Sequence, residues 1–109
     1  VWTLQSPDQS AVLASDNGEP VVIVNTRGNT LRIAQAVLPP PAGSVFELWA
    51  VVPDQAPLSL GTFSAADSIE LATGLADGVT LAVSVEPPGG SPTGVPTGQV
   101  IATGVLKDV

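Results

Sequence analysis

The chain has 109 residues, the length of one ordinary domain, and its 44% apolar content, against 12% charged residues, is enough to form a buried core. Three basic residues stand against ten acidic ones, a formal charge of -7 at pH 7, which disfavours nucleic acids and anionic membranes as partners because both bind through cationic surfaces. Cysteine, histidine, tyrosine and methionine are absent, which removes any disulfide framework, the commonest general base and the commonest metal ligand.

Membrane and targeting segments are also missing from the sequence. No apolar run approaches the roughly 18 to 20 residues that a membrane-spanning helix needs, and no basic region followed by an apolar stretch marks a signal peptide. We therefore expect that the chain does not itself insert into a membrane, and that any tether lies outside it. Residues 1–109 are interpreted as one domain, in which Val1 to Leu4 form an extra edge strand or residues 1–6 are the remnant of a linker.

Short runs with alternating side chains are separated by Pro, Gly, Asn and Asp at intervals of roughly eight to twelve residues. This spacing predicts an all-β fold, an antiparallel β-sandwich of the Ig-like or Greek-key type with seven or eight short strands. The expected strands are 10–15, 21–25, 30–38, 44–52, 58–63, 68–73, 79–86 and 99–106.

The run 68–73 is the most ambiguous of these. Ser64 and Asp67 have the spacing of a capping box, which would open a helix. The residues of the run nevertheless alternate as in a strand, and Gly74 and Gly78 would cut a helix short, so we favour a strand. Gly61, inside the run 58–63, indicates a bulge or a close backbone approach.

One face of the run 44–52 is wholly apolar and is expected to face the core: Phe46, Leu48, Ala50 and Val52. The other face carries Glu47 and Trp49, and we expect it to point outward unless the strand is central and buried on both sides. An exposed Trp49 would be a platform for stacking on sugars or docking a partner, whereas packing of the ring inside the fold is the more common case.

Ten carboxylates raise the question of acid–base catalysis, which in glycosidases and aspartic proteases needs two carboxyl groups at a set separation. None lies in a recognisable motif. Glu47 and Glu86 are the best candidates, because burial among apolar residues could raise the pKa of a strand carboxyl. The commoner case is a solvated or turn-anchoring carboxylate, and we expect Glu86 to accept hydrogen bonds from N–H groups of the loop that follows it.

Two further kinds of site are weighed and set aside. Asp16, Asn17 and Glu19 carry oxygen atoms suited to calcium, but their spacing is not that of an EF-hand, and capping of their own turn explains them better. A serine nucleophile would need Lys107, the sole lysine, or a carboxylate as its base, and neither GxSxG nor a phosphate-binding glycine motif occurs. The sequence therefore predicts no enzyme, no metal site and no cofactor.

Two segments of the sequence, VFELWAVVPDQAPLSLGTF at 45–63 and LAVSVEPPGGSPTGVPTGQVIATG at 81–104, resemble the carboxy-terminal domain of the anti-sigma-K factor (RskA) family. The first has the family's aromatic, polar, Leu, Trp pattern followed by a turn and a short Leu-Gly strand. The second includes the proline- and glycine-rich loop 86–98 and has the family's Glu-Pro-x-Gly-Gly-Ser-Pro stretch. The composition of this loop leaves open whether it is ordered.

The resemblance implies a membrane-spanning anti-sigma factor. In that arrangement an amino-terminal cytoplasmic part, absent here, binds an extracytoplasmic-function sigma factor, one transmembrane helix follows, and this domain lies outside in the periplasm or on the face of the cell envelope. The implied role is sensory or regulatory, through contacts with a membrane-proximal protease or another envelope protein that alter proteolytic release of the sigma factor. The alternative is an adhesive or carbohydrate-binding surface module with Trp49 and the loop 86–98 as its contact surface.

The resemblance assigns no catalytic residue and no ligand set. What it transfers is a set of signature residues, interpreted as structural or contact residues: Trp49, Glu86, Gly89, Gly90, Pro92 and Thr93.

Overall fold

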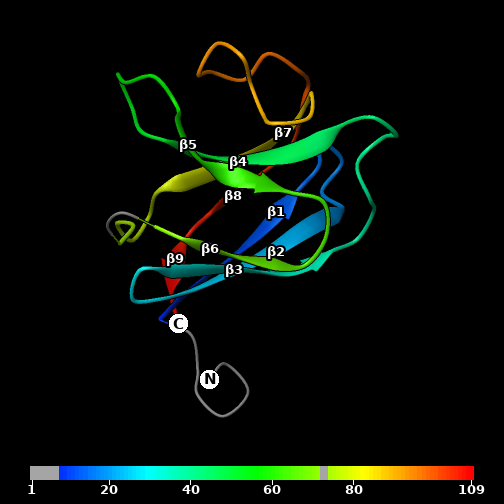
Figure 1. Cartoon of the computed structure of the whole chain (residues 1–109). Helices are drawn as coiled ribbons and strands as arrows, with labels where there is room; N and C mark the ends of the chain where they lie inside the picture. The colour runs from blue at the N-terminus through cyan, green and yellow to red at the C-terminus, as the bar shows by residue number, and fades with distance from the viewer. Residues whose placement is uncertain (1–7, 72–73) are drawn as a thin grey trace.

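The computed structural model of the chain describes residues 8–71 and 74–109, which form strands, turns and bends (Figure 1). The strands are β1 (Gln9–Ala14), β2 (Pro20–Arg27), β3 (Thr30–Ala36), β4 (Val45–Val51), β5 (Leu58–Phe63), β6 (Asp67–Glu70), β7 (Thr80–Glu86), β8 (Val100–Val105) and β9 (Lys107–Asp108). Within these ranges no helix is long and apolar enough to cross a membrane. Each expected run contains a strand, whereas the extra strand or linker at the N-terminus falls outside the described residues.

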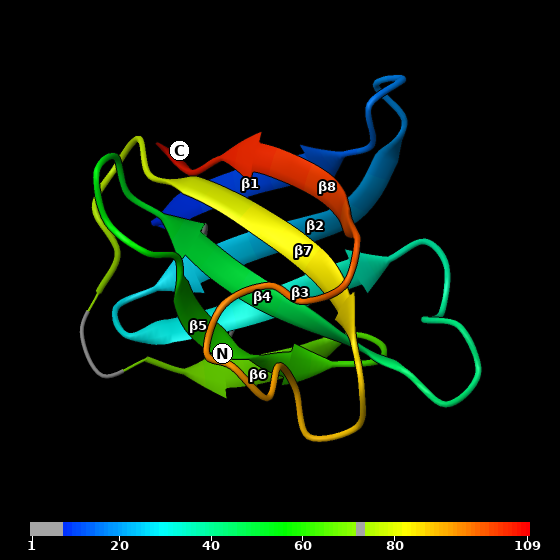
Figure 2. The ribbon, with the colours of Figure 1, turned by 90° about the horizontal axis from the view of Figure 1, so that it is seen from above.

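The strands join along one hydrogen-bonded path in the order β5-β4-β7-β8-β1-β2-β3-β6, with β9 paired to β1, and neighbouring strands are antiparallel. The path curls into a barrel-like sandwich in which β5, β4, β7 and β8 form one layer and β1, β2, β3 and β6 the other (Figures 1 and 2). The chain crosses between the layers after β3, after β5 and after β6. The predicted all-β, antiparallel fold is confirmed.

The core lies between the two layers. The largest wholly buried apolar side chains in it come from both layers: Leu13, Val22, Val24, Leu31, Ile33, Leu48, Leu81, Val83 and Leu106. Burial of each such side chain stabilises the fold by about 1.5–3 kcal/mol. The predicted inward face of β4 is confirmed for Phe46, Leu48 and Ala50, but Val52 lies beyond the end of the strand and is exposed.

Two details of the strand predictions are settled by the pairing. The ambiguous run contains a strand, β6, which pairs with β3 over Asp67–Glu70. Of the two features considered for Gly61, the bulge is present, because the β4–β5 register shifts between Leu48 and Trp49. The close neighbour is a side chain and not backbone: a Cβ at Gly61 would lie 3.3 Å from Cδ1 of Ile69.

Candidate functional site

The outer face of β4 and β7 is buried, although it points away from the core. Trp49 is 0% exposed, Glu86 1% and Glu47 6%, and Ser84 is also wholly buried. The loop that joins β7 to β8, residues 87–99, crosses above β4 and β5 on this side of the molecule (Figure 2). The favoured prediction that this face of β4 points into solvent is therefore wrong for Glu47. The alternative left open, a central strand buried on both sides, holds, since β4 lies between β5 and β7, and Trp49 is packed inside the fold as the more common case has it. Alternation correctly separated the two faces of the strand, but it carries no information about a loop that covers the second face.

Glu86, the last residue of β7, anchors the end of this loop. Its Oε2 accepts hydrogen bonds from the Ser84 hydroxyl (2.6 Å), the Thr97 N–H (3.0 Å) and the Gly98 N–H (3.2 Å). Its Oε1 accepts one from the Thr97 hydroxyl (2.5 Å). Gly98 has to be glycine here, because a Cβ would lie 1.7 Å from the carbonyl oxygen of Val85. The expectation that Glu86 accepts hydrogen bonds from loop N–H groups is confirmed.

The same hydrogen bonds determine the ionisation of Glu86. Burial by itself raises the pKa of a carboxyl group, but the bonds from Ser84, Thr97 and Gly98 favour the charged form more strongly, so the pKa of Glu86 is lowered from its ordinary value of 4.5. The sequence-based expectation that burial raises this pKa has the wrong sign. A carboxylate that stays ionised at neutral pH, with both oxygens engaged by the loop, is unsuited to act as a general acid.

Glu47 anchors the beginning of the loop in the same manner. Its Oε1 accepts the N–H of Ser91 (2.7 Å), and its Oε2 accepts the hydroxyl of Ser59 from the neighbouring strand β5 (2.5 Å). Gly90 passes directly above this carboxylate with φ of +93°, and a Cβ there would lie 3.0 Å from Glu47 Oε1 and 3.1 Å from Thr62 Cγ2. The two glutamates thus hold the two ends of the loop, and neither is free to react.

Trp49 belongs to the same buried network. Its indole Nε1–H donates to the Ser84 hydroxyl oxygen (2.9 Å), and that hydroxyl donates in turn to Glu86. Every buried side-chain nitrogen and oxygen in the described part of the chain has a hydrogen-bond partner. A wholly buried tryptophan cannot stack on a sugar, so the contact role considered for Trp49 in a surface module is wrong.

The remaining signature residues lie in the loop itself. Gly89 and Gly90 both have positive φ, at 89° and 93°, and Gly90 is buried. Pro92 and Thr93 are exposed at the tip, where the Thr93 N–H donates to the Ser91 hydroxyl oxygen (3.2 Å). The loop is therefore hydrogen-bonded within itself as well as at its ends. The interpretation of the six signature residues as structural or contact residues stays a prediction.

The residues weighed as calcium ligands form a turn between β1 and β2. Oδ1 of Asn17 accepts the Ser15 hydroxyl and the Glu19 N–H (3.2 Å), and Gly18 N–H donates to the Ser15 carbonyl (2.8 Å). This is the turn-capping arrangement that the sequence favoured. Over residues 8–71 and 74–109, no three acidic side chains gather into a group that could hold a metal ion.

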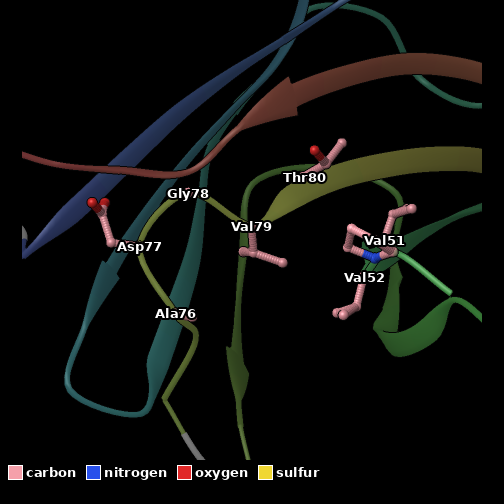
Figure 3. Close-up of a pocket in the computed structure, with 8 residues that line it drawn as sticks. Val51, Val52, Ala76, Asp77, Gly78, Val79 and Thr80 are labelled. Carbon is pink, nitrogen blue, oxygen red and sulfur yellow. The ribbon is translucent and has the colours of Figure 1, made fainter. Parts of the chain in front are cut away.

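A hollow of about 300 Å3 lies between the end of β4 and the start of β7, and Figure 3 shows the residues that line it. Val79 points toward Val51 and Val52, whereas the carboxylate of Asp77 points away from them (Figure 3). Asp77 Oδ1 accepts the N–H of Asp108 (2.6 Å). The hollow therefore lacks the convergent polar groups that a reaction site needs.

Sequence reasoning missed three members of this arrangement: Ser84, Ser59 and Ser91. Ser84 could have been found, because it precedes Glu86 by two residues and so shares its face of β7. Ser59 and Ser91 lie 12 and 44 residues from Glu47, and no local pattern joins them to it.

The fold and the two anchored carboxylates define a class: a small antiparallel β domain with a proline–glycine loop fixed across its outer face. A family model described as "Anti-sigma-K factor rskA, C-terminal" matches residues 2–100. The chain belongs to this family, which is regulatory rather than catalytic, and the resemblance found in the sequence is confirmed. No curated protein and no solved structure matches the chain.

Proposed function

We propose that this domain is the extracytoplasmic, sensory part of a membrane-spanning anti-sigma factor, and that its contacts with envelope proteins modulate proteolytic release of an extracytoplasmic-function sigma factor. The observation that carries the proposal is the family match over residues 2–100. In such a protein the sigma factor binds the cytoplasmic part, and this domain acts from the other side of the membrane on a protease or on another envelope protein.

The geometry favours contact over catalysis. The two carboxylates best placed for chemistry, Glu47 and Glu86, are occupied in fixing the loop, and Glu86 is held in its ionised form. What the domain offers to a partner is shape: a folded β-sandwich with an ordered loop. A folded domain of this kind resists cleavage, because proteases cut exposed and extended chain, so its presence restricts cleavage to the segments next to it.

The experiment compares cleavage of the tether in three forms of the full-length protein: intact, with this domain deleted, and with this domain replaced by an unrelated β domain of similar size. Immunoblots of the membrane-bound and released fragments give the rate of cleavage. We expect deletion to change that rate and the unrelated domain not to restore regulation by the stimulus. Identical cleavage in all three forms, with and without stimulus, would refute the proposal.

The surface-module alternative finds no support in the geometry. Its principal contact residue, Trp49, is 0% exposed and hydrogen-bonded inside the fold.

A further inference from the structure

Two adjoining hollows form a groove at the end of the sandwich that holds the β1–β2 turn and the β3–β4 connection. The first has a volume of about 380 Å3, and its wall is mainly apolar: Val21, Leu38, Pro39, Pro41, Phe46 and Ile101. The second has a volume of about 350 Å3 and includes Asp16 and Asn17. Both are lined by Ser15, Gln99 and Ile101, so the two hollows adjoin. The groove thus has an apolar half and a more polar half that carries the carboxylate of Asp16.

The apolar half is open to solvent. Leu38 at its rim is 64% exposed, and the preceding residue, Val37, is 50% exposed. Both follow Ala36, the last residue of β3, and precede the three prolines 39–41, which cannot continue a strand ladder. Exposed apolar side chains beside a concave apolar surface are typical of a site that another molecule covers.

The charges around the groove all have one sign. Asp16 and Glu19 are exposed in the β1–β2 turn, beside Ser15 and Val21. The three cations of the sequence lie further along the strands: Arg27 at the far end of β2, Arg32 opposite Asn25, and Lys107 opposite Ser10. Since a strand rises about 3.3 Å per residue, these positions are about 13 to 20 Å from Val21 and Ser15. A cationic group that enters the groove therefore meets negative charge first.

The polar groups of the rim differ in what they offer to a ligand. Pro39 and Pro41 have no N–H, and the side-chain donors of Ser15 and Asn17 are engaged within the β1–β2 turn. The side-chain amide of Gln99 can both donate and accept, whereas the carboxylate of Asp16 only accepts. The group that complements Asp16 therefore donates hydrogen bonds and carries a positive charge. A guanidinium, with its five N–H groups and no acceptor, fits this description.

We propose that this groove binds a segment of a partner protein in which an aliphatic side chain stands next to an arginine. The aliphatic side chain enters the apolar hollow beside Leu38 and Ile101, and the guanidinium lies at Asp16. This inference rests on the proposed function, since it describes the chemistry of the partner through which the domain acts. The net charge of -7 draws such a segment toward the domain and accelerates the encounter at low salt.

The test uses the whole chain, labelled for NMR, and the peptide Ac-Leu-Arg-Leu-NH2. The matched control is the same peptide with citrulline in place of arginine, which keeps the shape and removes the charge. We expect the arginine peptide to shift the methyl signals of Val21, Leu38 and Ile101. The signals of Val51 and Val79, which line the hollow in Figure 3, serve as the internal control and stay in place.

Two protein variants distinguish an effect of the Asp16 charge in the groove from an effect of the net charge of the domain. D16N is expected to lower the affinity for the arginine peptide about twofold to fivefold and to leave the affinity for the citrulline peptide unchanged, since an exposed ion pair contributes on that scale. D54N removes the same charge from the β4–β5 turn, far from the groove, and changes neither affinity. Higher salt should reduce the advantage of arginine over citrulline.

The proposal is wrong if neither peptide shifts these methyl signals, if the shifts appear only elsewhere, or if arginine and citrulline bind equally to the native chain. Its failure is distinguishable from failure of the proposed function. Should peptide binding fail while domain deletion still changes cleavage of the tether, the domain regulates through another surface. Should the peptide bind while deletion changes nothing, the groove is real and the regulatory role is not.

Discussion

Replacing Glu86 by glutamine removes one charge from the loop anchor and keeps the size of the side chain. The amide cannot satisfy the same donors, because one of its two terminal atoms is itself a donor. In the most favourable orientation the amide nitrogen faces the Thr97 hydroxyl, which can rotate to accept, and the remaining oxygen keeps Ser84, the Thr97 N–H and the Gly98 N–H.

The expected cost follows from those three bonds. A hydrogen bond to a charged group contributes about 1.5–3 kcal/mol and one between neutral groups about 0.5–1.5 kcal/mol, so each bond weakens by about 1 kcal/mol. The smaller penalty of burying a neutral amide offsets part of this loss. We expect E86Q to lower the free energy of unfolding by about 2–3 kcal/mol. E70Q, at an exposed carboxylate that accepts the Thr30 hydroxyl at 3.0 Å, should change it by less than about 0.5 kcal/mol.

The measurement is urea unfolding followed by tryptophan fluorescence in a Trp2→Phe background, where Trp49 is the only emitter. With a slope of about 1–1.5 kcal/mol per molar urea for a chain of this size, E86Q should lower the midpoint by about 1.5–3 M and E70Q by less than about 0.5 M. Equal midpoints for E86Q and E70Q would refute the reasoning, because the buried carboxylate would then contribute no more than an exposed one.

Three further predictions concern the same network. The difference in the free energy of unfolding between the native chain and E86Q should be largest above pH 4.5 and should shrink as the pH falls through the lowered pKa of Glu86 in the folded state. Urea unfolding across a pH series measures this difference. Gly90→Ala should lower the free energy of unfolding by about 2–3 kcal/mol and Gly89→Ala by about 1 kcal/mol, as measured by thermal unfolding. Both glycines have positive φ, but only a Cβ at Gly90 approaches Glu47. Ser84→Ala leaves the Trp49 indole N–H without its acceptor and should lower the free energy of unfolding by about 2–3 kcal/mol. An unchanged calorimetric transition in this variant would contradict the network.

The all-β fold could be predicted because alternation and turn residues are local signals. The period of two placed Phe46, Leu48 and Ala50 on the core side, and glycine and proline marked the ends of the strands. β9 was missed because its two residues, Lys107 and Asp108, have no alternation to read, and it is defined only by pairing with β1.

The same difference between local and long-range signals applies to the candidate site. The anchoring role of Glu86 could be predicted because its partners, Thr97 and Gly98, follow it within the same loop. The burial of Glu47 could not, because it depends on Ser91, 44 residues later, being brought back across β4. The groove likewise joins the β1–β2 turn to the β3–β4 connection and the start of β8, segments that only the folded chain brings together.

The central claim is that two buried carboxylates fix the loop across the outer face of the sheet. Native-state hydrogen exchange of the backbone amides tests it most directly, since the Ser91, Thr97 and Gly98 N–H groups donate to those carboxylates. We predict that these three amides exchange slowly in the native chain, and that Thr97 and Gly98 exchange faster in E86Q, where their bonds are weakened, while amides of the core strands keep their rates. Exchange of all three at the rate of an unstructured chain would contradict the claim.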